Sequence, residues 1–262
     1  MIDKKFIKKH LNNILIKGYT KIDNILDHKE CDKIKIISKK IYFKSKNKLK
    51  INNPLEETIY NLHNKNSVYR KFIDHKIIIK IVKEALSAGS YNNDEHIILR
   101  QSAVRNPKKG FAQQLHNDSR ISGSKRPMII QVIWLLDDFN KFNGATRIVP
   151  KSHLKNSFPK TNKKYSSEKY LIGKKGSVFL FNAAMWHGSS KKVSNEDRWG
   201  MIFSYCRWFM RPSFDFNKNT PLNIFNKLNK YQKELLGFKY NPPKDEFTRG
   251  SARSKYPEKP LN

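Results

Sequence analysis

Apolar and polar residues follow a helical spacing in the first third of the 262-residue chain. GYTKIDNIL at 18–26 alternates in part, but DHKECDKIKIISKKIYF from Asp27 onward repeats its apolar residues as a helix does, with Asp27 and Glu30 in the pattern of a capping box. Residues 54–88 predict two or three further helices, of which the last has apolar positions at 78, 79, 81 and 82. We therefore expect a helical layer over about residues 1–90.

The pattern changes to that of strands at about residue 95. Five segments rich in β-branched and aromatic residues follow, separated by turn residues: HIILRQSAV (96–104), MIIQVIWLLDDF (128–139), GATRIVP (144–150), GSVFLFNAAMWH (176–187) and RWGMIFSYCRWFM (198–210). Helices followed by at least five strands favour a β-sandwich or barrel over about 95–212, covered by the helical layer.

The C-terminal part, about 213–262, contains one further helical pattern. NIFNKLNKYQKELLG at 223–237 predicts a helix, and a tail with Pro and Lys residues follows from about Asn241. No internal repeat and no domain linker interrupts the chain, so we expect residues 1–262 to form a single domain.

The charge of the chain is strongly positive. Lys and Arg number 53 against 22 Asp and Glu, a formal net charge of +31. Such a field attracts nucleic acid, anionic membranes or anionic substrates. However, the lysines are scattered rather than gathered on one periodic face, and Lys, Asn and Ile recur throughout the chain, as they do in proteins of AT-rich genomes. Nucleic acid is therefore the less favoured partner.

The two cysteines, Cys31 and Cys206, have no CxxC spacing and cannot form a disulfide framework, which indicates a reducing compartment. The N-terminal MIDKKFIKKHLNNILIKGY lacks the apolar run of a signal peptide, and no segment approaches the ~20 apolar residues that span a bilayer. We expect a cytoplasmic protein without a membrane span.

Two of the eight histidines stand two residues before a carboxylate. The two pairs differ in the secondary structure predicted around them. His28 and Glu30 fall in the first turn of the helix predicted from Asp27, where Glu30 favours the positive end of the helix dipole. His116 and Asp118, in QQLHNDS, lie in the strand-rich part, where residues i and i+2 of an extended chain point the same way. His116 and Asp118 are therefore the candidate metal ligands.

His187, at the end of a later predicted strand, is the candidate for a third ligand. Two histidines and one carboxylate on one face match the facial triad of non-haem Fe(II) oxygenases. Arg198 follows 11 residues later at the start of the next strand, where its guanidinium would suit a carboxylate of a 2-oxo acid. Ser189 would add a hydroxyl donor. A pair of merely hydrogen-bonded core histidines would leave the spacing of Asp118 and Arg198 unexplained.

The combination of HND, NGATRIVPKSH (143–153) and MWHGSS followed by Arg198 resembles the phytanoyl-CoA dioxygenase family of Fe(II)/2-oxoglutarate-dependent oxygenases, over roughly residues 16–240. This resemblance implies a double-stranded β-helix, or jelly roll, with Fe(II), 2-oxoglutarate and O2 at the site. It also implies His116, Asp118 and His187 as iron ligands, with Arg198, Ser189 and Trp134 as co-substrate contacts. A tryptophan inside an apolar strand is equally an ordinary core residue.

The chain departs from the family pattern at two positions. Lys151 in PKSH stands where the family usually has Gly, and Asn117 stands where Gln is frequent. His153 is a family hallmark without a ligand role, and we interpret it as a structural hydrogen-bonding residue. Since related halogenases lack the carboxylate ligand, Asp118 favours oxygenation over halogenation.

The resemblance implies hydroxylation of a small or lipid-like metabolite, coupled to conversion of 2-oxoglutarate to succinate and CO2. A basic rim flanks HND and would suit an anionic substrate, although it would equally form a solvated loop: Arg100, Arg105, Lys108, Lys109, Arg120, Lys125 and Arg126. The alternatives are a nucleic-acid oxygenase, for which the second arginine is not suitably spaced, and a non-catalytic jelly-roll binding protein. The sequence leaves the oligomeric state open.

Overall fold

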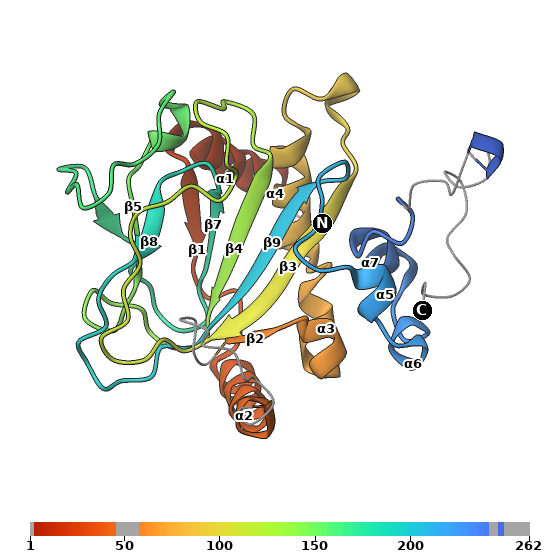
Figure 1. Ribbon diagram of the computed structural model, residues 1–262, viewed down its shortest axis with the longest axis horizontal. Helices are drawn as coiled ribbons and strands as arrows, with labels where there is room; N and C mark the ends of the chain where they lie inside the picture. Colours follow the sequence, from red (N-terminus) through yellow and green to blue (C-terminus); the bar gives the residue numbers. More distant parts are fainter. Residues whose placement is uncertain (1–2, 46–57, 241–245, 249–262) are drawn as a thin grey trace.

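Two antiparallel sheets form the core of the structure, a computed structural model that describes residues 3–45, 58–240 and 246–248 (Figure 1). The larger sheet contains, in spatial order, β1 (Tyr19–Ile22), β7 (Val178–Asn182), β4 (Ile129–Leu135), β9 (Gly200–Arg207), β3 (Ile97–Arg105) and β2 (Thr58–Tyr60). The smaller contains β6 (Lys169–Tyr170), β5 (Thr146–Ile148) and β8 (His187–Ser189). The two sheets do not join into a closed barrel, and the predicted jelly-roll fold is confirmed as a two-sheet sandwich.

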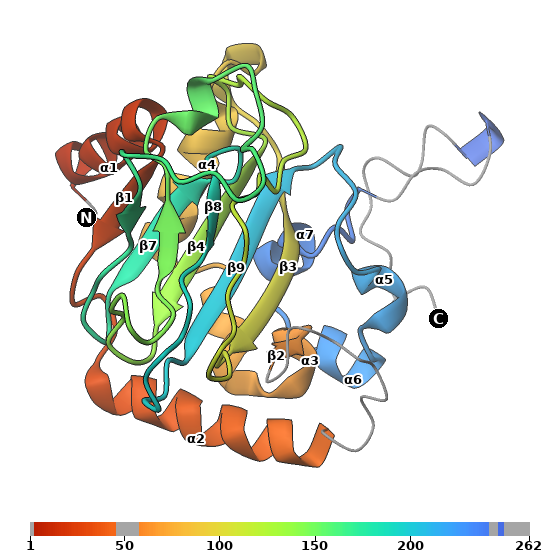
Figure 2. The ribbon, with the colours of Figure 1, turned by 60° about the vertical axis from the view of Figure 1, so that its left-hand side comes forward.

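The chain alternates between the two sheets after β4. It runs from β4 to β5 and β6 in the smaller sheet, returns to β7, crosses again to β8, and ends the sandwich in β9 (Figure 2). Because of these crossings, the first residue of β8 faces residues of the larger sheet that are far away in sequence. The mouth of the sandwich therefore collects side chains from separate segments.

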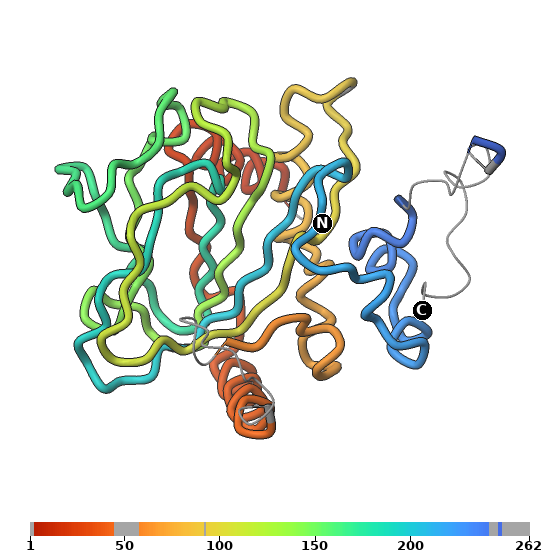
Figure 3. The backbone as a smooth tube through the Cα atoms, viewed as in Figure 1, coloured from red at the N-terminus to blue at the C-terminus, as the bar shows by residue number. Residues whose placement is uncertain are grey.

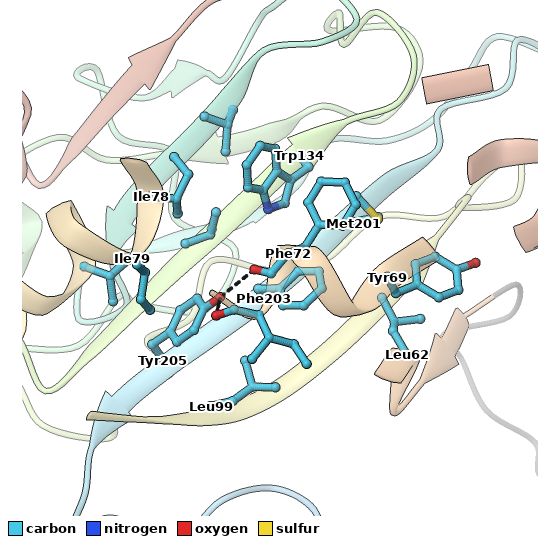
Figure 4. Packing of buried hydrophobic residues seen from close by; sticks show 14 of the residues in the cluster. Leu62, Tyr69, Phe72, Ile78, Ile79, Leu99, Trp134, Met201, Phe203 and Tyr205 are labelled. Carbon is cyan, nitrogen blue, oxygen red and sulfur yellow. Dashed lines mark hydrogen bonds between the residues drawn. The ribbon is translucent and has the colours of Figure 1, made fainter. Parts of the chain in front are cut away.

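Helices cover the outer face of the larger sheet, as the helical spacing predicted. They are α1 (Lys4–Lys17), α2 (His28–Ser45), α3 (Leu62–Lys65), a 3₁₀ helix (Ser67–Phe72) and α4 (Lys76–Ser87). In Figure 4, Trp134, Met201 and Phe203 of the sheet pack against Phe72 of the 3₁₀ helix. The hydroxyl of Tyr205 donates to the carbonyls of Phe72 and Ile73, both at 3.0 Å, which ties this layer to β9.

The start of α2 accounts for the second His-x-carboxylate pair. Asp27 accepts hydrogen bonds from the backbone N–H of Lys29 at 2.6 Å and of Glu30 at 3.3 Å, so the Asp27 half of the predicted capping box is confirmed. The Glu30 carboxylate pairs with Lys71 instead of returning to the cap. His28 is exposed, and the pair therefore belongs to a helix start rather than to a site.

The C-terminal part packs beside β3 and differs from its prediction (Figure 3). The single helix expected at 223–237 is wrong, because the structure has α6 (Leu222–Phe225) and α7 (Lys230–Leu235), preceded by α5 (Phe216–Asn219). The break falls at Asn229, whose side chain accepts from the N–H of Gln232 in a capping box and starts a new helix. The predicted tail from Asn241 lies outside the described residues except for 246–248.

Within the part of the chain that the structure describes, no helix combines the length and the apolar character that crossing a membrane requires.

Candidate metal centre

Backbone pairing brings His116 and His187 together across 71 positions of sequence. The N–H of His116 donates to the carbonyl of His187 at 2.8 Å, and the N–H of His187 donates back at 3.0 Å. Two residues later, the N–H of Asp118 donates to the carbonyl of Ala183 at 3.0 Å. The HND segment is thus held against the β7–β8 connection, and its two outer side chains face the first residue of β8.

The side chains of His116, Asp118 and His187 converge at the mouth of the sandwich. The Nε2 atom of His116 lies 3.5 Å from Oδ1 of Asp118, and Nε2 of His187 lies 3.4 Å from Oδ2 of the same carboxylate. One ligand atom from each side chain lies within 4.8 Å of the other two. Across residues 3–45, 58–240 and 246–248, this is the one group of three or more such side chains that could hold a metal ion.

A hydrogen bond from Nδ1 fixes the orientation of each histidine ring. Nδ1 of His116 donates to the carbonyl of Gln114 at 2.9 Å, and Nδ1 of His187 donates to the carbonyl of Met185 at 2.8 Å. Because a carbonyl only accepts, both protons reside on Nδ1 in the neutral rings, and both Nε2 lone pairs are left for a metal. Bonds of this kind commonly orient metal-binding histidines.

Asp118 is held as a carboxylate by its neighbours. Burial alone would raise its pKa, but the imidazoles of His187 and His116, when protonated, and a hydrogen bond from Gln131 Nε2 at 2.7 Å hold this pKa well below its ordinary value. For His187, burial alone would lower the pKa, but Asp118 raises it, and the pKa of His187 lies above its ordinary value. For His116, burial and the neighbouring His187 lower the pKa. Gln131 was not singled out from the sequence.

Asn117, between the two ligand candidates, shapes the turn that follows them. Its Oδ1 accepts from the N–H of Ser119 at 2.8 Å and of Arg120 at 3.1 Å, and its Nδ2 donates to the carbonyl of Ile121 at 3.0 Å. It is buried and points away from the cavity, as alternation along an extended chain requires. The departure from the family pattern at this position therefore leaves the convergence of His116 and Asp118 intact.

A cavity of about 290 Å³ opens beside the three side chains. It lies between the sheets, and its lining comes from seven strands and the HND segment. The lining residues are Thr58, Tyr60, Arg100, Gln101, Ala103, Arg105, Gln113, His116, Asp118, Gln131, Ile133, Thr146, Phe181, His187, Gly188, Arg198, Gly200 and Ile202. A mixed polar and apolar cavity of this size suits a small ligand.

Arg198 lines this cavity from the segment that leads into β9. Its side chain is buried, its guanidinium lies over the ring of Phe139 at 4.2 Å, and Nη2 donates to the carbonyl of Gly144 at 2.6 Å. Its Nε has no hydrogen-bond partner among the described residues. Burial and the nearby Arg105 lower the pKa of Arg198 well below its ordinary value. A buried guanidinium with an unused donor is suited to a carboxylate.

Ser189 lies next to Arg198 but does not line the cavity. Its hydroxyl donates to the same carbonyl of Gly144, at 3.1 Å, and to that of Ser190 at 3.2 Å. It supports the segment that the Arg198 guanidinium contacts. Its direct contact with a co-substrate remains a prediction.

Trp134 is not brought to the site. It is fully buried on the helix-facing side of β4, with its ring centroid 5.1 Å from Phe72 and 5.0 Å from His75. Its neighbour Ile133 lines the cavity instead, since successive strand residues point to opposite faces. We correct the assignment of Trp134 as a co-substrate contact to that of a core residue.

The other histidines singled out from the sequence have structural partners. His63 Nε2 lies 3.0 Å from the hydroxyl of Thr220, and His75 packs on Trp134; both lie outside the three-residue group, as predicted. His153 Nε2 donates to the carbonyl of Leu15 at 3.1 Å, which confirms its structural role. Lys151 has φ 64°, the left-handed conformation in which glycine is favoured, and this explains why Gly suits the position.

The basic rim predicted around HND divides into two groups. Arg100 and Arg105 line the cavity. The side chains of Lys108, Lys109, Arg120, Lys125 and Arg126 are exposed and do not line it. The solvated-loop interpretation therefore holds for five of these residues and not for the two on β3.

The donor set fits the predicted metal. Two imidazole nitrogens and one carboxylate oxygen converge from one side, while the cavity leaves the opposite side open. This arrangement matches the facial triad of Fe(II) oxygenases. The buried Arg198 with its unpartnered Nε fits a 2-oxo dicarboxylate bound beside the metal.

Comparisons with known proteins agree with these features. The family model described as Phytanoyl-CoA dioxygenase (PhyH) matches residues 16–200. The chain is similar to a multifunctional dioxygenase, prhA, of Penicillium brasilianum, with 23% identity over 190 residues, 67% of this chain and 61% of that protein. It is 30% identical over 110 residues to the dioxygenase ALT11 of Alternaria alternata, covering 41% of this chain and 35% of that protein. The chain thus matches less than two thirds of the length of either relative.

Among solved structures, the chain resembles HygX from Streptomyces hygroscopicus with nickel and 2-oxoglutarate bound. The TM-score is 0.64 at 16% sequence identity, over 78% of this chain and 88% of HygX. HygX with nickel, 2-oxoglutarate and hygromycin B bound matches with a TM-score of 0.61, also at 16% identity, over 78% of this chain and 88% of HygX. At such identities the likeness shows the fold.

Proposed function

Because the chain belongs to the phytanoyl-CoA dioxygenase family, we propose that it is an Fe(II)- and 2-oxoglutarate-dependent dioxygenase that hydroxylates a small or lipid-like metabolite. Succinate and CO2 are the co-products, and O2 is the oxidant. One observation carries the proposal: His116, Asp118 and His187 present two nitrogens and one carboxylate within 4.8 Å of one another beside a cavity.

The residues of this chain position the reactants. His116, Asp118 and His187 would hold Fe(II), which supplies the redox chemistry that couples decarboxylation of the 2-oxo acid to hydroxylation. The bonds from both Nδ1 atoms to backbone carbonyls keep the rings in place, and Gln131 keeps the Asp118 carboxylate in place. Arg198 would receive the distal carboxylate of 2-oxoglutarate, since its buried Nε has no other partner among the described residues.

The size of the cavity supports a small-molecule substrate. About 290 Å³ must accommodate 2-oxoglutarate together with the reacting part of the substrate. HygX, which shares the fold, has been solved with the small molecule hygromycin B bound. These observations favour a metabolite over a nucleic acid, despite the net charge of +31.

Anaerobic titration of the metal-free protein with Fe(II) and then 2-oxoglutarate tests the proposal. We expect a weak visible charge-transfer band that forms only when both are present, followed by succinate formation when O2 is admitted. Asp118→Ala and His187→Ala should lose the band and the turnover, since each removes a ligand. Asp94→Ala removes an exposed carboxylate elsewhere and should leave both unchanged.

Two outcomes would refute the proposal. If Asp118→Ala kept the band and full turnover, the ligand assignment would be wrong. If the wild-type protein bound no iron and formed no band, the jelly roll would be a non-catalytic binding protein. Circular dichroism of each variant distinguishes loss of a ligand from loss of the fold.

We further propose that residues 1–262 act as one domain in the cytoplasm. The single-domain assignment is supported by one buried apolar cluster that extends from Ile7 in α1 to Phe238 after α7. The cytoplasmic assignment is supported by Cys31 and Cys206, which are both buried free thiols.

A further inference from the structure

A second group of polar side chains lines the cavity along β2 and β3. Thr58 and Arg105 are direct partners across the β2–β3 ladder, and both face the cavity. The hydroxyl of Thr58 and Nε of Arg105 are buried, and neither has a hydrogen-bond partner among the described residues. Two neighbouring residues of the cavity wall thus carry buried donors without an acceptor among the described residues.

Arg105 lacks a counter-charge in the part of the chain that the structure describes. Every ion pair of that part involves other residues, and Arg105 instead lies against the ring of Phe111, 5.3 Å from its centroid. A half-buried charge with a buried, unpartnered Nε and no counter-charge favours an anion in the cavity.

A β-bulge adds a second guanidinium to the same wall. Leu99 pairs with Tyr205 and Gln101 pairs with Ser204, so Arg100 is an extra residue with no partner on β9. The bulge turns Arg100 and Gln101 both toward the cavity, where regular alternation would admit only one of them. Bulges commonly serve to redirect a side chain in this way.

The charges of the proposed centre balance without Arg100 and Arg105. The two charges of Fe(II) and the one of Arg198 are offset by Asp118 and the two carboxylates of 2-oxoglutarate. Arg100 and Arg105, both half-buried in the wall of the cavity, remain in excess. Because 2-oxoglutarate has no further carboxylate to offer, the balancing anion belongs to another molecule.

We propose that Thr58, Arg100 and Arg105 form a second anion subsite, which binds a carboxylate or phosphate group of the molecule to be hydroxylated. This inference rests on the proposed function for the identity of that molecule as the substrate, but the binding of an anion at Arg105 does not depend on iron. The subsite restricts the substrate class to anionic metabolites. It also fixes the substrate by one end, so that a carbon further along reaches the metal.

Calorimetry of the anaerobic protein, loaded with Fe(II) and saturating 2-oxoglutarate, tests the subsite with three probes of equal chain length: hexanoate, hexyl phosphate and hexanamide. We expect one of the two anions to bind at least about tenfold tighter than the neutral amide, and the tighter anion identifies the group. Arg105→Met should remove most of this preference, whereas Arg105→Lys should keep part of it. Arg120→Met, which removes an exposed arginine of the rim, is the matched control and should retain the preference.

Thr58→Val provides a second variant in case Arg105→Met does not fold. It removes one hydroxyl at nearly constant shape and should weaken binding of the preferred anion about fivefold, without changing that of hexanamide.

The proposal is overturned if the wild type binds all three probes equally, or if Arg105→Met keeps the anion preference. It is also overturned if Arg105→Met weakens 2-oxoglutarate binding as much as Arg198→Met does, since Arg105 would then serve the co-substrate. If the protein takes up no iron, the proposed function fails, and the same probes on the unloaded protein still test the subsite.

Discussion

Replacing Gln131 with leucine isolates the hydrogen bond that orients the carboxylate of the proposed centre. Gln131 lies on β4 and is 3% exposed, and its Nε2 donates to Oδ2 of Asp118 at 2.7 Å. The other amide atom, Oε1, has no partner among the described residues. The substitution therefore removes one strong bond together with one unsatisfied acceptor, at similar side-chain volume.

The magnitude follows from the charge and exposure of the partner. A hydrogen bond to a charged group contributes about 1.5–3 kcal/mol. The Asp118 side chain is 30% exposed, so water recovers part of this in the variant, and about 1–2 kcal/mol remains. We expect Fe(II) to bind roughly tenfold more weakly, within the range known for partners of metal ligands. The metal-free protein should melt at about the same temperature, because loss of this bond is offset by removal of the unsatisfied Oε1.

Competition with a chelator of known affinity measures metal binding, and thermal unfolding of the metal-free protein measures the fold. The matched control is Gln101→Leu, the same change on β3 in the same cavity, where the side chain has no hydrogen bond to the three ligand candidates. It should leave metal affinity within about threefold of the wild type. If Gln131→Leu also left the affinity unchanged, the carboxylate would not depend on this bond, and Gln131 would have no positioning role.

Three further outcomes can be checked independently. Arg198→Met should weaken 2-oxoglutarate binding to the Fe(II)-loaded protein roughly ten- to hundredfold without altering iron affinity, because the carboxylate loses its charged donor; spectroscopic titration measures this, and an unchanged value would remove Arg198 from the site. Burial lowers the pKa of His63 to about 4, so between about pH 6.5 and 4 the unfolded chain binds a proton that the folded protein does not. The free energy of unfolding should then fall by about 1.4 kcal/mol for each pH unit of acidification in that window. Denaturant unfolding of wild type and His63→Gln should differ by this slope, and parallel curves would contradict the assignment. Lys151→Gly should raise the melting temperature by about 2 °C, because φ 64° costs a side-chain-bearing residue about 1 kcal/mol. Lys155→Gly, at φ −82°, should give no gain, and an equal gain in both variants would exclude relief of strain as the cause.

The convergence of the three ligand candidates was only partly predictable. The i, i+2 spacing of His116 and Asp118 in an extended segment is a local property, and local geometry places both side chains on one side. The position of His187 depends on the crossings between sheets and on the His116–His187 bridge, which no local pattern encodes. Its place at the end of a predicted strand made His187 a candidate, and the resemblance to a family then implied its role as a ligand.

The error at Trp134 has a physical cause in β4 itself. All seven residues of this strand are buried, since one face packs on helices and the other on the second sheet. A strand buried on both faces lacks the apolar–polar alternation that would distinguish them. The one polar residue, Gln131, marks the face of the cavity, and Trp134 is three positions away and therefore on the opposite face. That single polar residue was the available signal.

The two arginines of the proposed anion subsite illustrate a different limit of the sequence. Seven basic residues around HND are equivalent in composition, yet only Arg100 and Arg105 reach the cavity. Arg105 faces inward because it pairs with Thr58 of β2, a three-residue strand inside a stretch whose spacing predicts helices. Arg100 faces inward because of a bulge, which is a property of the pairing between strands rather than of either strand alone. An exposed arginine is satisfied by water, whereas these two line the cavity, where we propose that an anion binds. In the proposed subsite, the preference for an anionic substrate would thus follow from the pairing of β2 with β3 and from the bulge in β3, and not from the abundance of lysine across the surface.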